Sequence, residues 1–235
     1  MRPELKLIID AGIDIENAIG FVKYSEFVDW FFPQELQFVF SKKFSSSERN
    51  KIIVEYTKYM FRIKKTEIRK GVEETRKKWA KIEGKYYDFI EKIFEGHPWP
   101  KGKYVGYVSV YRMFPRDIKE KTFHFPYSAD IWDPLRTIAH EMMHFIFFDY
   151  IGQKYRIKEE NRIRGKNPKY IWQISETFNT VIENRKSYQD IFSAKENCQP
   201  YPGCEKMFEA MKKQWSKKQN IESLLGRWLS GEILK

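Results

Sequence analysis

The stretch TIAHEMMHFIFF, residues 137–148, places two histidines and one glutamate inside an otherwise apolar segment. His140 and His144 are one helical turn apart, so a helix presents both imidazoles on the same face. Two imidazole nitrogens in this arrangement can take two corners of a zinc tetrahedron, and Glu141 can reach a zinc-bound water without ligating the metal. The His-Glu-x-x-His pattern therefore predicts a zinc-binding helix with a general base beside the metal.

The sequence around this pattern favours a buried helix. Asp133 supplies a capping carboxylate and Pro134 a proline at the first helical position, so we expect the helix to run from there to about Tyr150. A pair of core histidines held by hydrogen bonds is the structural alternative. Burying two imidazoles and a carboxylate without partners is costly, and a metal accounts for all three polar side chains at once.

The motif resembles the zinc-binding helix of the zincin metallopeptidases. Metzincins continue to a glycine and a third histidine, whereas Phe147 and Tyr150 stand at those positions here and no histidine follows His144. The resemblance therefore implies the gluzincin type, in which a glutamate on a second helix is the third ligand. It also implies Zn²⁺ as the cofactor, a peptide or protein as the substrate, and hydrolysis by zinc-activated water with Glu141 as general base and acid.

Several downstream glutamates are candidates for the third ligand. Glu176 lies in residues 171–182, an otherwise uncharged helical segment, and a lone carboxylate there requires a cation or a metal. Glu183 shares the same helix face two turns on and is a weaker candidate. Glu159 and Glu160 lie in a charged linker, where we expect them to be solvated. We therefore predict His140, His144 and Glu176 as the ligands.

The zincin resemblance also implies a strand edge that binds an extended substrate through backbone hydrogen bonds. Residues 122–127, which include His124 and Phe125, or their expected hairpin partner at residues 103–114, are the predicted edge. His124 is also considered as an unusual metal ligand.

A tyrosine often stabilises the oxyanion in this family, and Tyr170 and Tyr188 flank the helix of Glu176. Neither can be preferred, because the chain contains 14 tyrosines. The Gly-x-Met-Glu-Asn motif of the aminopeptidases is absent from the sequence, so aminopeptidase activity is not expected.

The remaining patterns predict a helix-rich α+β protein with a zincin-like active-site helix, a small upstream sheet and a C-terminal helical part. The expected elements are a strand at 5–10, a helix at 14–32 capped by Asp14, a strand or helical turn at 36–40, a helical region from Ser45 to Glu95 broken at Gly71 and Gly84, a hairpin of 103–114 and 122–127, a linker at 152–169, and helices at 170–186 and 205–229, the last interrupted near Asn220. We expect a single domain over residues 1–235, with an upper part at about 1–144 and a lower part at about 145–235.

The composition limits the class of protein. The chain has 235 residues, 42% of them hydrophobic, and a net charge of +11. Mixed-charge stretches at 62–81 and 206–218 are typical of solvated helix faces, so specific nucleic-acid binding is not expected. The sequence has no apolar run long enough to span a membrane, and acidic residues come too early for a secretory signal, which predicts a cytoplasmic protein. Cys198 and Cys204 are either a local disulfide or two thiols.

Two other functions remain open. The chain could be a basic helical domain that binds nucleic acid or a protein partner and uses the His pair structurally. It could also be a catalytically silent zincin whose cleft is filled by the C-terminal helix. The zinc content of the purified protein separates the metallopeptidase from the basic binding domain, and the sequence does not indicate an oligomeric state.

Overall fold

The computed structural model describes residues 2–24, 28–194, 196–230 and 233–234. The chain forms two compact units, each made of separate stretches. The unit that we call the sheet unit contains Pro3–Lys81 and Gly102–Glu141, and the helical unit contains Met1–Arg2, Ile82–Lys101 and Met142–Lys235. The two parts expected from the sequence, about 1–144 and 145–235, were each continuous, whereas each unit combines separate stretches. The sequence did not indicate that residues 82–101 belong with the C-terminal part.

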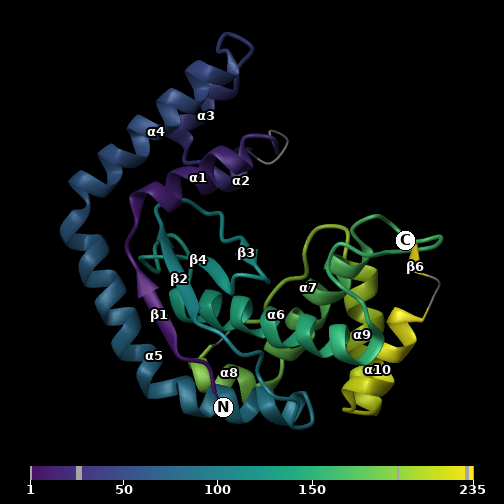
Figure 1. Cartoon of the computed structure of the whole chain (residues 1–235). Helices are drawn as coiled ribbons and strands as arrows, with labels where there is room; N and C mark the ends of the chain where they lie inside the picture. Colours follow the sequence, from purple (N-terminus) through teal and green to yellow (C-terminus); the bar gives the residue numbers. More distant parts are fainter. Residues whose placement is uncertain (1, 25–27, 195, 231–232, 235) are drawn as a thin grey trace. The chain divides into compact units, whose positions relative to one another are not determined.

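The sheet unit contains a four-stranded mixed sheet (Figure 1). Its strands are β1 (Leu5–Ile8), β2 (Tyr104–Ser109), β3 (Arg116–Asp117) and β4 (Thr122–Pro126), in the order β1-β2-β4-β3. β1, β2 and β4 are parallel neighbours, and only β3 is antiparallel. The predicted hairpin of β2 and β4 is therefore wrong. The short strand β3 lies in the segment expected to be a turn, and it reverses the chain direction between β2 and β4.

The position of β4 also corrects the predicted substrate edge. β4 pairs with β2 on one side and with β3 on the other. The backbone N–H of His124 donates to the carbonyl of Pro115 at 3.0 Å, and the side chain of Phe125 is fully buried. Residues 122–127 are thus an interior strand and not an edge. Within the described chain, β3 is the edge strand on this side of the sheet.

Helix α1 (Ala11–Phe21) packs against β2 and against α4. Its cap is Asp10, whose carboxylate accepts from the N–H groups of Gly12 and Ile13 at 2.8 and 3.2 Å, so the predicted cap at Asp14 is wrong. The next helix, α2 (Val28–Phe31), ends before Phe32. The expected single helix over 14–32 is thus two helices, and residues 25–27 of that prediction lie outside the described residues.

The segment at 36–40 is helical, with α3 (Gln34–Gln37) followed by the 3₁₀ helix η2 (Phe38–Phe40). Helix α4 (Ser46–Ile63) begins at a capping box. The Ser45 side chain accepts from the backbone N–H of Glu48, and the Glu48 carboxylate accepts from the backbone N–H of Ser45. This start agrees with the prediction from the serine cluster.

Helix α5 (Lys65–Ile93) is continuous, so the helical region breaks at Lys64 and not at the two glycines. Gly71 has a different role. A Cβ atom there would lie 2.0 Å from the carbonyl oxygen of Tyr127, so only glycine lets α5 approach the chain end of β4 this closely. Arg76 on the same helix donates to the carbonyl of Leu7 on β1 at 3.2 Å. These contacts hold α5 against the sheet.

The helical unit is organised around one central helix. Its elements are the last part of α5 (from Ile82), the second part of α6 (Pro134–Tyr155), α7 (Tyr170–Glu183), α8 (Lys186–Phe192), α9 (Glu205–Lys217), α10 (Ile221–Leu229) and the antiparallel pair β5 (Arg162–Ile163) and β6 (Ile233–Leu234). α7 packs against α8, α9 and β5. Helix α6 extends into the expected linker, and the predicted interruption near Asn220 is confirmed by the break between α9 and α10.

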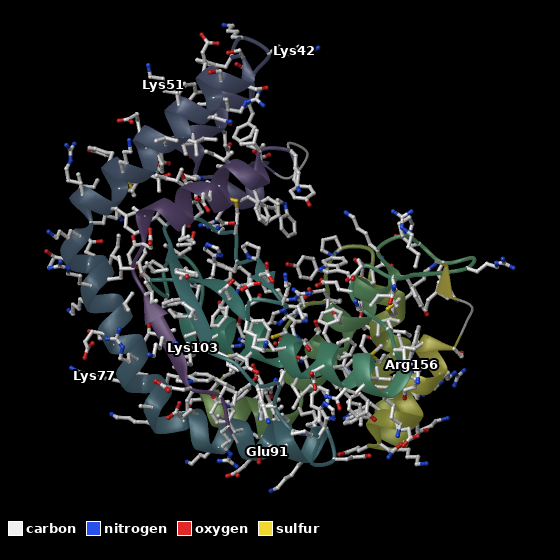
Figure 2. The ribbon with its side chains drawn as sticks, viewed as in Figure 1. Lys42, Lys51, Lys77, Glu91, Lys103 and Arg156 are labelled. Atoms are coloured by element: carbon white, nitrogen blue, oxygen red, sulfur yellow. The ribbon has the colours of Figure 1, made fainter. Side chains whose placement is uncertain are left out.

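Charged side chains lie on exposed helix faces, as expected from the mixed-sign stretch at 62–81. On α5, Glu73 pairs with both Arg76 and Lys77, one turn along the helix. Figure 2 shows Lys77 directed away from the ribbon of α5. Such exposed pairs contribute little to stability.

Two smaller expectations are answered by the structure. Cys198 and Cys204 do not form a disulfide, so the thiol alternative holds. Among the described helices, none combines the length and the apolar character needed to cross a bilayer.

Candidate metal centre

Helix α6 begins as the sequence predicts. The backbone N–H groups of Leu135 and Arg136 donate to the carboxylate of Asp133 at 2.9 and 3.2 Å, and Pro134 occupies the first helical position. The helix then carries apolar side chains on all of its faces, and a helix of this kind is stable only when it is buried. Ile138, for example, is fully buried. The polar side chains of this helix are therefore held in a rigid setting.

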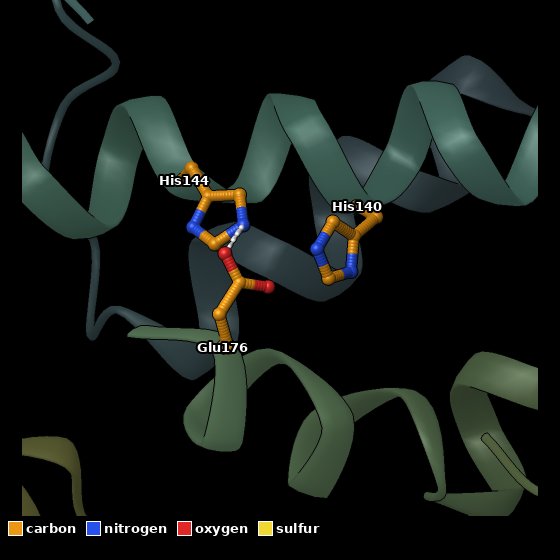
Figure 3. A group of neighbouring side chains, drawn as sticks. All are labelled: His140, His144 and Glu176. Carbon is orange, nitrogen blue, oxygen red and sulfur yellow. Dashed lines mark ion pairs between the residues drawn. The ribbon is translucent and has the colours of Figure 1, made fainter. Parts of the chain in front are cut away.

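Three side chains on α6 and α7 converge (Figure 3). Ligand atoms of His140, His144 and Glu176 all lie within 4.8 Å of one another. The boundary between the two units falls inside α6, after Glu141, so the continuous helix itself places His140 one turn before His144. His144 and Glu176 both belong to the helical unit. The structure thus brings together the three residues that the sequence predicted as ligands.

The spacing of this group suits a metal ion. The Nε2 atom of His144 and the Oε1 atom of Glu176 are 3.4 Å apart. A hydrogen bond between such groups is usually shorter, about 2.7–3.2 Å. Two ligand atoms bound about 2.0–2.1 Å from a tetrahedral zinc lie about 3.4 Å apart. The three residues could therefore hold a metal ion, and two imidazoles with one carboxylate are a donor set that zinc accepts.

Burial differs among the three side chains. His144 has no exposed surface and Glu176 is 2% exposed, whereas His140 is half-buried. A buried imidazole beside a buried carboxylate needs compensation for lost hydration, and a shared cation would add to it.

Packing of α7 positions Glu176. Phe178, two residues further on, is fully buried, and its ring lies 5.7 Å from that of Phe94, 5.4 Å from Phe147 and 6.2 Å from Trp215. The Thr180 hydroxyl donates to the backbone carbonyl of Glu176 at 2.9 Å, so it bonds the helix and not the carboxylate. The ligand is thereby held by a helix in the core of the unit.

The other predicted ligand candidates do not join the group. Among the described His, Cys, Asp and Glu residues, the one group with metal-ligand spacing consists of His140, His144 and Glu176. Glu183 is buried at the end of α7, Glu160 is exposed, and Glu159 is half-buried. His124 belongs to β4 of the sheet unit, where burial lowers the pKa of its imidazole to about 4. By exposed surface it is a half-buried strand residue.

Glu141 has a neighbour that the sequence did not suggest. The Nη1 atom of Arg116, on the edge strand β3, lies 3.8 Å from the Oε2 atom of Glu141. Both side chains are nearly buried, with 9% and 7% exposed surface. No periodic pattern marks Arg116, because its strand has two residues and the chain contains 43 lysines and arginines. The pairing emerges only from the folded sheet.

The two tyrosines proposed for the oxyanion are engaged elsewhere. The hydroxyl of Tyr170 donates to the carbonyl of Trp228 at 3.1 Å. The ring of Tyr188 is fully buried and packs against Phe89 and Phe192. These contacts give neither tyrosine support for the oxyanion role, which stays a prediction.

The remaining histidine, His97, lies in the loop that follows α5. Its Nε2 atom lies 2.7 Å from the Oδ2 atom of Asp149 on α6, and its ring packs against Tyr150 at 5.2 Å. This pair ties the loop to α6 within the helical unit and takes His97 out of consideration as a ligand.

No protein-family model, curated protein or solved structure compared with the chain matches it. The functional argument therefore rests on the side chains of α6, α7 and β3.

Proposed function

We propose that the protein is a zinc-dependent metallopeptidase of gluzincin type with a zincin-like fold, which hydrolyses bonds in a peptide or protein substrate. The observation that carries this proposal is the convergence of His140, His144 and Glu176 from two buried helices. Glu141 follows the first ligand directly on the same helix. This combination supports a hydrolytic metal centre more than a structural His pair, because a structural pair needs no adjacent carboxylate.

The chemistry follows from the residue types. Zn²⁺ held by His140, His144 and Glu176 would supply Lewis-acid activation of a water for attack on the substrate carbonyl. Glu141 accepts a proton from the attacking water and then donates it to the leaving amine, so one carboxylate serves as general base and general acid. His140 and His144 would have to be neutral to hold the metal, since a protonated imidazole cannot bind one.

Arg116 adds a positioning role to this scheme. Its guanidinium lies beside the Glu141 carboxylate, and an ionised partner at this distance favours the charged form of a carboxylate. A charged and oriented Glu141 is the form that can accept a proton. We therefore expect Arg116 to hold the general base and not to bind the metal.

The substrate edge moves from β4 to β3 in this proposal. β3 is the antiparallel edge of the sheet, and its Arg116 already contacts Glu141 on α6. An extended peptide can add to such an edge through backbone hydrogen bonds. Because β3 has two residues, we expect such a substrate to gain few backbone bonds there and to depend on side-chain contacts as well.

Elemental analysis tests the metal centre. Protein purified without added metal is expected to contain about one zinc per chain, and a His140→Ala/His144→Ala double variant to contain almost none. A wild-type preparation that stays metal-free after incubation with zinc would overturn the proposal and favour the basic binding domain. Zinc at full occupancy without hydrolysis of casein or a peptide library would favour the catalytically silent alternative.

A further inference from the structure

A second candidate site lies in the helical unit, in a pocket between α5, the start of α8 and the end of α9. The pocket has a volume of about 450 Å³, which is within the range of small-molecule sites. Phe89 and Trp215 supply aromatic surface, and Ile93 and Ile191 supply aliphatic surface. Arg185 lies among them. The pocket thus combines apolar walls with a cationic group.

The guanidinium of Arg185 is held between two aromatic rings. Its central carbon lies 5.7 Å from the ring centroid of Phe89 and 5.8 Å from that of Trp215, both within the range of cation–π contacts. One terminal nitrogen donates to the side-chain oxygen of Gln219 at 2.7 Å. A guanidinium has five N–H donors, and Gln219 accepts from one of its nitrogens.

No carboxylate balances this charge within the described residues. The hydrogen-bond partner of the Arg185 guanidinium is the neutral Gln219, and half-burial lowers the pKa of Arg185. Lys85 and Lys92 line the same pocket from α5, and neither forms an ion pair with a described acid. The acid of the pocket, Asp88, is paired with Arg2. The pocket is therefore positively charged.

We propose that this pocket binds a small organic anion whose negative group is carried on an aromatic ring. The anionic group meets Arg185, which can offer it parallel N–H donors, and the two lysines increase the attraction. The ring lies against the aromatic and aliphatic walls, where burial of apolar surface favours it. A phosphate ester and a carboxylate share this chemistry. The proposal is independent of the metal centre.

Calorimetric titration of the full-length protein with phenyl phosphate, in low salt, tests the proposal. We expect saturable binding at or below about 1 mM. Inorganic phosphate alone and phenol alone are expected to bind much more weakly, because each offers half of the recognised chemistry. Benzoate in a parallel titration shows whether a carboxylate replaces the phosphate.

Variants assign the binding to the pocket. Arg185→Gln is expected to weaken phenyl phosphate binding by about tenfold or more, the effect of losing a charged hydrogen bond. Lys85→Gln/Lys92→Gln, which changes exposed side chains only, is expected to weaken it by about threefold. Arg49→Gln is the matched control, since Arg49 also lies over a ring, that of Phe40, but in the sheet unit.

Three results would overturn the proposal. The first is no saturable binding of phenyl phosphate to the wild type. The second is binding of phenyl phosphate that is unchanged both in Arg185→Gln and in the lysine double variant. If Arg185→Gln does not fold, unchanged binding in the lysine double variant is sufficient. The third is equal binding of inorganic phosphate, which would show that the aromatic and aliphatic walls take no part.

Discussion

Glu176 on α7 and Asp14 on α1 are both buried helix carboxylates, yet their surroundings differ. Glu176, in the helical unit, is 2% exposed and lies 3.4 Å from a ring nitrogen of His144, with His140 also close. Asp14, in the sheet unit, is fully buried and accepts a hydrogen bond from the backbone N–H of Val110 at 3.0 Å. Within the described residues, no cation pairs with Asp14.

The comparison shows what burial of an acid does and does not indicate. At Asp14, burial is the main influence and raises the pKa of the carboxyl group to about 7, against the hydrogen bonds that favour the charged form. At Glu176, two further potential metal ligands, His140 and His144, lie close enough to share a cation with the carboxylate. A buried carboxylate therefore indicates a metal site only when other ligands converge on it, and otherwise it indicates a pH-dependent core.

The largest effect is expected for a substitution of Glu141, which should lower the rate of hydrolysis without changing zinc content or stability. Glu141→Gln keeps the shape of the side chain but cannot accept a proton at neutral pH, so the rate of peptide hydrolysis should fall by about a thousandfold. Zinc content and thermal stability should remain those of the wild type, which elemental analysis and calorimetry measure. Glu160→Gln, on an exposed residue, is the control. Hydrolysis near the wild-type rate in Glu141→Gln would remove this residue from the mechanism.

The role of the acid on α7 is tested by two variants of one helix. Glu176→Ala removes a predicted ligand, and the zinc affinity should fall by more than about 100-fold, which exceeds the loss of an outer partner of a ligand. Glu183→Ala, also buried and two turns further on, should leave the affinity nearly unchanged. Competition with a zinc-binding dye measures both. Equal losses in the two variants would mean that the effect comes from burial, as at Asp14, and not from ligation.

An intermediate effect is expected at the arginine beside the general base. Arg116→Gln should lower kcat by about tenfold or more, comparable to losing an outer partner at a metal site, while KM and zinc content change little. Arg116→Lys keeps the charge and should recover part of the loss. If Arg116→Gln instead raises KM at unchanged kcat, the arginine binds substrate and does not position Glu141.

The smallest effect concerns stability and pH in the sheet unit. Because the folded pKa of Asp14 is raised from 3.8 to about 7, the folded state keeps a proton that the unfolded chain loses. Its contribution to stability is complete below pH 4 and decreases as the pH rises to 7, by about 4 kcal/mol at most. Asp14→Asn should remove this decrease from the free energy of unfolding measured by urea titration.

The exposed cap Asp10→Asn is the control for this measurement, and it should retain the wild-type slope. Zinc content should be unchanged in both variants, because neither residue belongs to the metal group. Identical slopes for Asp14→Asn and the wild type between pH 4 and 7 would contradict the assignment of a raised pKa to this carboxyl group.

The sequence by itself determined those features that depend on local periodicity and capping. The start of α6 at Asp133 and Pro134, the capping box at Ser45, and the single face shared by His140 and His144 each depend on residues within one or two helical turns. The choice of Glu176 as a candidate was also local, because a lone carboxylate in an uncharged helix needs a compensating partner wherever the helix packs.

The tertiary structure decided what depends on distant strands. The parallel pairing of β2 and β4 and the position of β3 at the sheet edge came from chain reversal by a two-residue strand, which has no periodicity to detect. The contact of Arg116 with Glu141 followed from that arrangement. Strands pair through backbone hydrogen bonds that nearly any sequence can form, so the residues alone did not reveal which strand lies beside which. Helix starts and helix faces, by contrast, depend on side chains that are close together in the sequence.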